Sequence, residues 1–449
     1  MMRVPVADAV AALRVWLEGE AIRHDAAQVQ RIEIPVPDLD PLRWLQAQRD
    51  PVKGYWAGRG DDIQRGALGE AEVLRGAEWQ DTADLVATVT ARLTDAVDAR
   101  YYGGFRFGPW HAQDASWRPF GTSRFLLPQF EVVRTPAGVH LACNFLGGPA
   151  ALPRWLAALD QLSFADPAAP AALQPPPFGL DRPDRAGWEQ QVVAAARAVA
   201  QGEVAKLVLA RQRVLDFGQT LDPFALLARL RTGAADCFLF GGVHAGLVAF
   251  MGAPPERLYR RIGRRIETEA VAGTRPRGDS LDSDRALARE LAASSKEQGE
   301  HRVVVDSIHD ALHPLCAEWL QERAPHVVKL RTVQHLVTNC CGRLREGVSD
   351  ADILANLHPT AAVSGWPRAA ALAAIARVEP FDRGWYAGPV GWLGCDAAEF
   401  AVAIRSGLVI GSKLCLFAGA GIMGDSDPAA EWQETEAKLA AFVSALTTS

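Results

Sequence analysis

Near the C-terminus, an apolar segment, a glycine-rich segment and a helix with strong start signals follow one another directly, and this order constrains the fold most. Residues 413–417 predict a short strand, and residues 419–421 (Gly-Ala-Gly) predict a turn after it. Asp427 and Pro428 are typical of the N-cap and the first position of a helix. The sequence therefore predicts a strand, a turn, an acidic loop and a helix, in that order.

The predicted C-terminal helix gathers charged side chains on one face. Residues three, four and seven apart stack along a helix, so Glu431, Glu434, Thr435 and Lys438 share a face. Two carboxylates and an ammonium group beside free backbone N–H groups could bind a metal ion and an anion together. An ordinary solvated face with ion pairs is the alternative, and other segments must decide between the two.

Charge and cysteine content narrow the class of protein. The 449 residues carry 47 Lys and Arg against 53 Asp and Glu, a formal net charge of −6, which does not favour a nucleic-acid partner. The seven cysteines include no CxxC pair, so we expect reduced thiols in a cytoplasmic protein. We expect no signal peptide, because Asp8 and the acidic residues of 18–20 interrupt the apolar positions at the N-terminus. We expect no membrane span, because the longest apolar run, 238–253, is too short.

Strand and helix patterns are mixed along the chain, with no short repeat. Strands are expected at 31–35, 101–107, 124–133, 138–145, 204–215, 237–250, 258–262, 265–270, 327–337, 384–392 and 400–410, with two more and a turn within 51–72. Helices are expected at 7–17, 82–99, 151–162, 187–201, 223–231 and 282–320, the last broken near 294–298. Many strands are hairpin-like neighbours, which favours an α+β fold over a doubly wound sheet.

A proline-rich segment at 165–183 is the clearest break in periodicity. It could link two domains or run over the surface of one. The N-terminal part alone resembles half a sandwich with uncovered faces, so we expect a single domain over 1–449. In this interpretation, 1–165 forms the N-terminal part of the sandwich, 166–185 the proline-rich connection and 186–449 the core.

Two residues could perform acid–base chemistry. Lys206 shares a strand face with small apolar residues, and burial of a lysine favours its neutral, basic form. A lysine on an edge strand that reaches solvent is an equally good interpretation. Glu256 follows a strand and two prolines. A rigid segment of this kind can direct one side chain into a cavity, although a surface turn is the more common result.

Other charged residues could bind a metal ion or an anion. Glu300 falls near a helix start, where a carboxylate either binds a metal or stabilises the helix dipole. Arg405 could form paired hydrogen bonds with a carboxylate. Residues 273–278 (GTRPRG) predict a tight turn that binds an anion or serves only as a loop. No His or Cys cluster has metal-binding spacing, so carboxylates would hold any metal ion, which favours Mg²⁺.

Six segments, taken in order, carry a family resemblance. They read ETEAVAGTRPRG, GEHRVVVDSI, LHPTAAVSGWPR, FDRGWYAGPVGW, EFAVAIRSG, and GAGIM followed by EWQETEAK. Together they closely resemble the chorismate-utilising enzymes, a family that includes isochorismate, anthranilate, aminodeoxychorismate and salicylate synthases. The resemblance covers 188–439. The N-terminal segments GYWAGRG, YYGGFRFGPW and FLLPQFEV resemble menaquinone-type isochorismate synthases more weakly.

The resemblance implies a fold and a reaction. The family fold, the anthranilate synthase or chorismate-binding fold, has two stacked antiparallel β-sheets flanked by helices, with the active site between the layers. Members that add water carry a lysine in the strand motif KxVLxR, which Lys206 matches. Aminodeoxychorismate synthases typically carry a lysine where this chain has Ala272. The resemblance thus implies an isochorismate synthase, an isomerase that adds water at C2 of chorismate and releases the C4 hydroxyl, for menaquinone or siderophore biosynthesis.

The resemblance also implies roles for individual residues. Lys206 would activate the attacking water, and Glu256 would protonate the leaving hydroxyl. Glu300 and Glu434 would bind Mg²⁺, with Glu431 reaching the ion through water. The substrate would be bound by Gly273, Thr274, His335, Ala362, Arg405, Gly419, Gly421 and Lys438.

Departures from the family pattern leave alternatives open. Pro254 replaces the usual serine two residues before Glu256, which could shift the acid, and Ala361 replaces a usual proline. Salicylate synthase, which shares the lysine and goes on to eliminate pyruvate, is one alternative function, and a non-catalytic chorismate-binding subunit is another. We expect chorismate as a small-molecule substrate, no nucleic-acid or membrane partner, and a monomer or weak homodimer.

Overall fold

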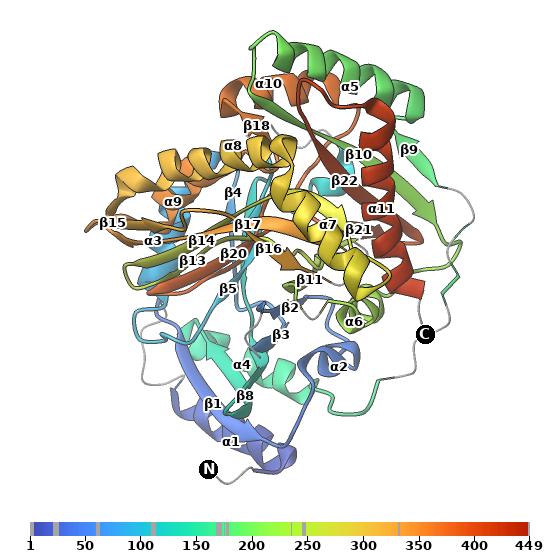
Figure 1. Cartoon of the computed structure of the whole chain (residues 1–449). Coiled ribbons are helices and arrows are strands. Elements are labelled where there is room, and N and C mark those ends of the chain that lie inside the picture. Colours follow the sequence, from blue (N-terminus) through green and yellow to red (C-terminus); the bar gives the residue numbers. More distant parts are fainter. Residues whose placement is uncertain are drawn as a thin grey trace.

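Two antiparallel β-sheets form the centre of the molecule (Figure 1). The computed structural model describes residues 4–20, 27–59, 63–108, 114–167, 173–174, 176, 179–234, 236–244, 248–330 and 333–447. Within these residues sheet A has twelve strands and sheet B has ten.

Sheet A combines strands from both ends of the chain. In spatial order it consists of β1 (Gln30–Val36), β8 (Gly138–Phe145), β7 (Phe130–Thr135), β3 (Gln64–Leu68), β2 (Lys53–Ala57), β11 (Leu239–His244), β12 (Val248–Gly252), β21 (Ser406–Ile410), β22 (Lys413–Ile422), β10 (Lys206–Asp216) and β18 (Gly365–Trp366). The short strand β9 (Leu180–Arg182) also pairs with β10.

Sheet B also combines strands from both ends of the chain. In spatial order it consists of β15 (Cys316–Gln321), β17 (Val333–Leu344), β14 (Arg265–Pro276), β13 (Arg257–Ile262), β20 (Ala397–Val402), β19 (Pro389–Leu393), β5 (Tyr101–Phe105), β6 (Ser123–Leu127) and β4 (Glu72–Gly76), and β16 (His326–Lys329) pairs with β17. The N-terminal part therefore supplies strands to both sheets. This arrangement agrees with one sandwich, although the single-domain organisation stays a prediction.

Helices cover the sandwich on several sides. They are α1 (Val6–Glu20), α2 (Pro41–Gln46), α3 (Thr82–Arg92), α4 (Gly148–Asp160), α5 (Arg185–Ala200), α6 (Pro223–Thr232), α7 (Leu281–Ala293), α8 (Ser295–Leu312), α9 (Asp350–Leu357), α10 (Arg368–Val378) and α11 (Pro428–Thr447). In Figure 1, α7 and α8 lie along sheet B, and α11 lies beside β22 and α5. Apolar side chains of both sheets and of these helices other than α7 form one buried cluster.

The C-terminal helix is fixed to sheet A by a buried arginine. Asp427 caps the helix as predicted, because its Oδ1 accepts a hydrogen bond from the backbone N–H of Ala430 at 2.8 Å. Arg211 of β10 donates to Thr435 Oγ1 at 2.8 Å, and its guanidinium lies 3.9 Å from the ring centroid of Trp432. The charged face of α11 is thereby held next to β10 and β22.

The α+β fold of two antiparallel sheets flanked by helices is confirmed, but the turn predicted at 419–421 is wrong. These residues continue β22, because Ala420 pairs with Leu209 and Ile422 with Leu207 of β10. The neighbouring strand β21 pairs with β22 only as far as Leu416. Beyond Leu416, no other strand of the described residues pairs with this edge of β22, where the backbone groups of 419–421 lie.

Several other local predictions are also wrong. The strands predicted at 124–133, 237–250, 327–337 and 400–410 are each two separate strands, and the helix predicted at 82–99 ends at Arg92. The helix predicted to 320 ends at Leu312, since Pro314 interrupts it and 316–321 pair with β17 as β15. Residues 273–276 complete β14 rather than forming a turn, with a bulge at Gly273, whose φ is +79°. The strand predicted at 384–392 begins only at Pro389, because 384–388 form turns. The break near 294 is where it was predicted, between α7 and α8.

Candidate active site

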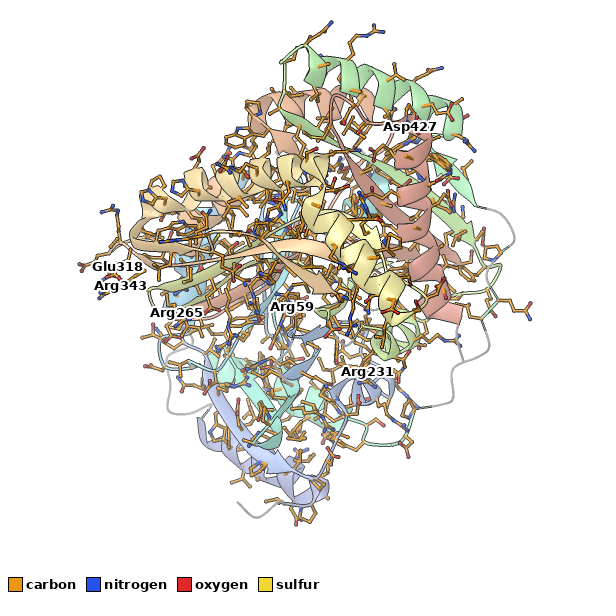
Figure 2. The ribbon with its side chains drawn as sticks, in the orientation of Figure 1. Arg59, Arg231, Arg265, Glu318, Arg343 and Asp427 are labelled. Atoms are coloured by element: carbon orange, nitrogen blue, oxygen red, sulfur yellow. The ribbon has the colours of Figure 1, made fainter. Side chains whose placement is uncertain are left out.

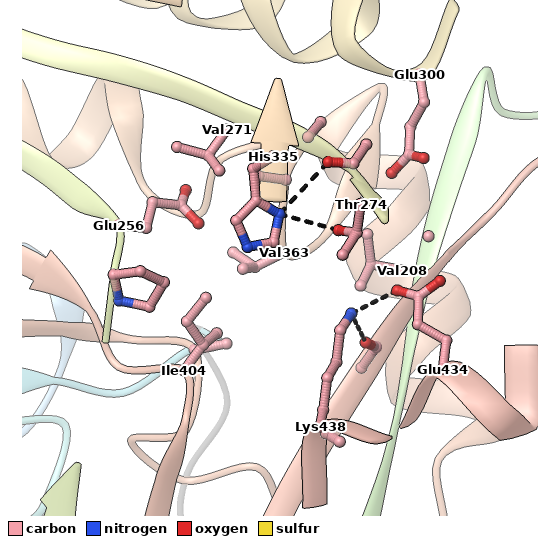
Figure 3. A pocket seen from close by; sticks show the side chains of 18 of the residues that line it. Val208, Glu256, Val271, Thr274, Glu300, His335, Val363, Ile404, Glu434 and Lys438 are labelled. Carbon is pink, nitrogen blue, oxygen red and sulfur yellow. Dashed lines mark hydrogen bonds and ion pairs between the residues drawn. The ribbon is translucent and has the colours of Figure 1, made fainter. Parts of the chain in front are cut away.

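A pocket lies between the sheets, where β10 and β22 of sheet A approach β14 and β17 of sheet B under α8 and α11 (Figure 3). Every site residue predicted from the sequence lines it: Lys206, Glu256, Gly273, Thr274, Glu300, His335, Ala362, Arg405, Gly419, Gly421, Glu431, Glu434 and Lys438. These residues come from segments up to 232 positions apart in the sequence, from 206 to 438. Their roles stay proposals, but their convergence is a property of the structure.

Lys206 is buried at the start of β10, with 1% of its surface exposed. Its Nζ lies 2.9 Å from Glu300 Oε1. The interpretation of Lys206 as an edge lysine that reaches solvent is therefore wrong. Gly421 leaves room for this pair, because a Cβ at that position would lie 2.5 Å from Glu300 Oε1 and 3.0 Å from Lys206 Cε. Any larger residue at 421 would displace one partner.

Glu256 is also buried, with 5% of its surface exposed. Burial, together with the nearby Glu269, raises the pKa of Glu256 to about 8, although Lys206 and Arg59 act in the opposite direction. At neutral pH this carboxyl group holds a proton that it can donate. The pocket thus contains a buried lysine and a protonated acid.

Across the pocket from Glu256, three carboxylates each lie beside a lysine. Glu300 pairs with Lys206, Glu434 Oε1 lies 2.5 Å from Lys438 Nζ, and Glu431 Oε1 lies 3.5 Å from Lys296 Nζ. Among the described residues, no three Asp, Glu, His or Cys side chains converge closely enough to hold a metal ion as they stand. Their carboxylate oxygens are donors of the type that Mg²⁺ prefers.

The environments of the two α11 carboxylates differ. Burial and the proximity of Glu434 raise the pKa of Glu431, although a hydrogen bond from Ser426 opposes this. Burial also opposes ionisation of Glu434, but Lys438 and Arg405 outweigh it and lower its pKa. Glu434 is therefore the stronger anion of the two.

Two residues in the wall of the pocket, Ala387 and Arg405, have strained backbone conformations. The φ angle of Arg405 is +50° and that of Ala387 is +61°, conformations that are uncommon for residues with a Cβ. The backbone is held there because the N–H of Ala387 donates to Ala403 at 3.1 Å and the N–H of Ala253 donates to Arg405 at 3.0 Å. Strain of about 1–3 kcal/mol per such residue is typical of functional sites.

His335 projects from β17 into the middle of the pocket (Figure 3). Its Nδ1 lies 3.0 Å from Thr274 Oγ1, while its buried Nε2 has no hydrogen-bond partner among the described residues. Burial and the nearby Arg405 and Lys438 lower the pKa of His335 to about 3, so the imidazole is neutral. A neutral ring with one free nitrogen can bind a polar group of a ligand.

Two charged pocket residues were missed from the sequence, Lys296 and Glu297. The Lys296–Glu300 spacing of four places both side chains on one face of α8, a signal that the segment SKEQGEH contains. Glu297 accepts hydrogen bonds from Arg275 at 2.6 Å and from the N–H of Thr274 at 3.3 Å. It thereby fixes the bulge of β14 that lines the pocket.

Comparison with known proteins places this geometry in a family. A family model described as chorismate binding enzyme matches residues 17–447. The salicylate biosynthesis isochorismate synthase of Pseudomonas aeruginosa is 35% identical over 459 residues, which cover 98% of this chain and 96% of that protein. Isochorismate synthase MenF of Escherichia coli is 33% identical over 424 residues, which cover 92% of each chain.

Solved structures agree with the sequence comparisons. The menaquinone-specific isochorismate synthase MenF from Escherichia coli has a TM-score of 0.87 at 30% identity, covering 99% of this chain and 100% of that one. Anthranilate synthase component I from Streptococcus pneumoniae shares the fold, with a TM-score of 0.63 at 22% identity. None of the helices in the described residues has the length and apolar character needed to span a bilayer. The chain belongs to the chorismate-binding enzymes, and it acts on a small molecule.

Proposed function

We propose that this protein is an isochorismate synthase that isomerises chorismate to isochorismate with the help of Mg²⁺. The observation that carries the proposal is the pairing of Lys206 and Glu256, a buried amine and a carboxyl group with a pKa of about 8, in one pocket. General acid–base catalysis needs these two groups, each in the correct protonation state near neutral pH. A subunit that only bound chorismate would need neither.

In the proposed mechanism, Lys206 takes a proton from water as the water oxygen forms a bond to C2 of chorismate. Glu256 donates its proton to the C4 hydroxyl, which leaves as water while the ring double bonds shift. Both groups must be desolvated, and burial of Lys206 and Glu256 supports this. The product keeps its enolpyruvyl group, which distinguishes this reaction from that of a salicylate synthase.

The remaining wall would bind the substrate through its carboxylates. Arg405 and Lys438 supply positive charge, and Lys438 Nζ already donates to the carbonyl oxygen of Gly419 at 2.9 Å. The free edge of β22 at Gly419 and Gly421 supports a role for backbone groups. The neutral His335, with Ala362, Gly273 and Thr274, would contact the ring and the attacking water.

Glu300 and Glu434 would hold Mg²⁺ directly and Glu431 through water, because carboxylate oxygens are the ligands this ion prefers. When bound, the ion would neutralise and orient a substrate carboxylate.

The location of the protein is a separate part of the proposal, and its seven free thiols support a cytoplasmic one. The protein would act there as a monomer or weak homodimer and supply menaquinone or siderophore biosynthesis.

Product analysis tests the proposal. Purified protein is incubated with chorismate and Mg²⁺, without and then with ammonium, and the products are separated by chromatography. We expect isochorismate alone, in both cases, and none after chelation of the metal. Salicylate with pyruvate would assign the protein to the salicylate synthases, anthranilate would contradict the role of Lys206, and unchanged chorismate would favour a non-catalytic subunit.

Binding of Mg²⁺ should stabilise the folded protein. A ligand that binds only the native state adds about 2.7 kcal/mol at a concentration of 100 times its Kd. We therefore expect the melting temperature to rise with Mg²⁺ in the wild-type protein and to rise much less in Glu434→Gln. Thermal unfolding followed by circular dichroism measures both; equal shifts in the two proteins would exclude Glu434 as a ligand.

Removal of Lys296 should tighten Mg²⁺ binding, because this lysine competes for Glu431. Its side chain is 37% exposed, so the pair contributes at most about 1 kcal/mol, and we expect Lys296→Met to lower the Kd for Mg²⁺ by about 2- to 5-fold. Titration calorimetry measures the Kd. Lys329→Met is the matched control, since Lys329 is 35% exposed and pairs with Asp284 outside the pocket. Weaker binding in Lys296→Met would contradict the competition.

A further inference from the structure

The position of Glu256 depends on a short segment, 254–257, that crosses from β12 of sheet A to β13 of sheet B. Its two prolines have no N–H, so only Glu256 and Arg257 can donate hydrogen bonds from its backbone, and carbonyl groups supply other contacts. The carbonyl of Pro254 accepts from the N–H of Phe238 at 2.9 Å, and that of Glu256 accepts from Val402 at 3.1 Å. Pro254 is therefore anchored through its backbone, in the place where the family usually has serine.

The peptide groups on both sides of Glu256 are held by one ion pair. Arg59 Nη1 donates to the carbonyl oxygen of Pro255, the residue before the acid. Glu269 Oε1 accepts from the N–H of Arg257, the residue after it, at 2.8 Å. Arg59 and Glu269 are joined by two parallel hydrogen bonds, of 2.7 Å (Nη1 to Oε1) and 2.5 Å (Nη2 to Oε2). The pair thus clamps the backbone that carries the acid.

Arg59 reaches this position from a distant part of the chain. Arg59 follows β2 in the N-terminal part of the sandwich, and Figure 2 shows it near the middle of the molecule. Its guanidinium lies 5.5 Å from the ring centroid of Phe238, a residue with no exposed surface. Glu269 is 5% exposed. Removal of one member of such a pair leaves the other as an uncompensated buried charge.

The same pair sets the charge around Glu256. The charged groups that face this carboxyl are Glu269 of β14, Lys206 of β10 and Arg59. Glu269 raises the pKa of Glu256, whereas Lys206 and Arg59 lower it. The two members of the ion pair therefore act on the pKa of the acid in opposite directions.

We infer that Arg59 and Glu269 are positioning residues for the acid Glu256, holding the peptide groups on both sides of it and balancing the charge beside it. The inference rests on the proposed role of Glu256. It gives the N-terminal part of the sandwich a function in catalysis, since Arg59 contributes to the site without lining the pocket.

Two substitutions test the inference against a matched control. The substitutions are Arg59→Met and Glu269→Gln. The control is Arg261→Met, because Arg261 lies on β13 and forms the same paired contact with Asp350, at 2.8 and 2.6 Å, without contacting the segment that carries Glu256. For each variant, kcat and KM for chorismate are measured with Mg²⁺ present, kcat/KM is followed from pH 6 to 10, and thermal stability is recorded.

We expect Arg59→Met to lower kcat by about 10- to 100-fold, as small displacements of a catalytic group do, with KM changed less than 2-fold. We expect Glu269→Gln to move the alkaline limb of kcat/KM down by about one pH unit, because a neighbouring negative charge is removed. Arg261→Met should lose stability and keep both the plateau of kcat and the alkaline limb.

The inference is overturned if Arg59→Met and Glu269→Gln match Arg261→Met in kcat and in the alkaline limb. If Arg59→Met does not fold, the alkaline limb of kcat/KM in Glu269→Gln alone decides, since the amide side chain keeps the shape of the carboxylate. Full turnover by Glu256→Gln would instead overturn the proposed acid. If Glu256→Gln is inactive while Arg59→Met and Glu269→Gln keep the kcat and pH dependence of the control, Glu256 stays the proposed acid. Only its positioning by Arg59 and Glu269 is then excluded.

Discussion

Replacement of Lys206 by methionine should lower kcat for chorismate isomerisation by about 10³-fold, the loss expected when a general base is removed. Methionine fills the buried space at the start of β10 but cannot accept a proton from water. KM should change little, because Arg405 and Lys438 remain to bind the substrate. Steady-state kinetics with chromatographic detection of isochorismate measures both constants.

A half-buried lysine, Lys53, provides the control for Lys206→Met. Lys53 donates to the carbonyl oxygen of Gln48 at 2.7 Å and lies outside the pocket, and burial lowers its pKa. Lys53→Met should therefore reproduce any general effect of removing a partly buried ammonium group while kcat stays within about 2-fold of the wild type. Retention of full turnover by Lys206→Met would exclude the lysine as the base and leave the source of the attacking hydroxyl to be found elsewhere in the pocket.

The site residues could be predicted because each one stands in a contiguous motif. Lys206, Glu300 and Glu434 were found from short segments in which strand or helix spacing, together with the family resemblance, points to one residue. Arg59 was not singled out, although its segment GYWAGRG resembles the family weakly. Its role depends on contacts with Pro255 and Glu269, about 200 residues away, and no local pattern encodes such a contact.

Errors in the fold have the same physical origin. Residues 419–421 have the composition of a turn, but β10 offers a full ladder of hydrogen bonds, and pairing overrides the local preference. Glycine is needed there for another reason, since the space beside Gly421 is filled by Lys206 and Glu300. Likewise, residues 316–321 have helical spacing, yet pairing with β17 makes them a strand. Local propensity is a weak guide where a sheet edge is available.

Each of the three carboxylates in the acidic wall of the pocket lies beside a lysine. Glu300, Glu431 and Glu434 would repel one another if they stood alone, but Lys296 and Lys438 compensate Glu431 and Glu434, and Glu300 lies against Lys206. The same arrangement gives Glu300 two partners, the proposed base and the proposed ion. Substitutions at Glu300 should therefore affect both metal binding and turnover, whereas the effect of Lys296 is confined to metal affinity.

Replacement of Glu256 by glutamine should abolish turnover and yet stabilise the protein at alkaline pH. The first effect, about 10³-fold in kcat, follows from the loss of the proton donor, since an amide cannot protonate the leaving hydroxyl. In the wild-type protein, kcat/KM should fall as pH rises through about 8, because the pKa of Glu256 is about 8. Glu256→Gln should lack this alkaline limb in whatever activity remains.

The second effect follows from the raised pKa of Glu256 in the folded state. Between its ordinary value of 4.5 and about 8, the folded protein keeps a proton that the unfolded chain has lost, so the free energy of unfolding declines as pH rises through this interval. Above pH 8 the buried carboxylate costs on the order of 3–5 kcal/mol, at 1.36 kcal/mol per pH unit. Glutamine never ionises, so Glu256→Gln should unfold at higher denaturant concentration than the wild type at pH 9 and at a similar one at pH 5. A variant that is less stable than the wild type at both pH values would show that Glu256 is ionised in the folded protein, and the acid would have to be another residue.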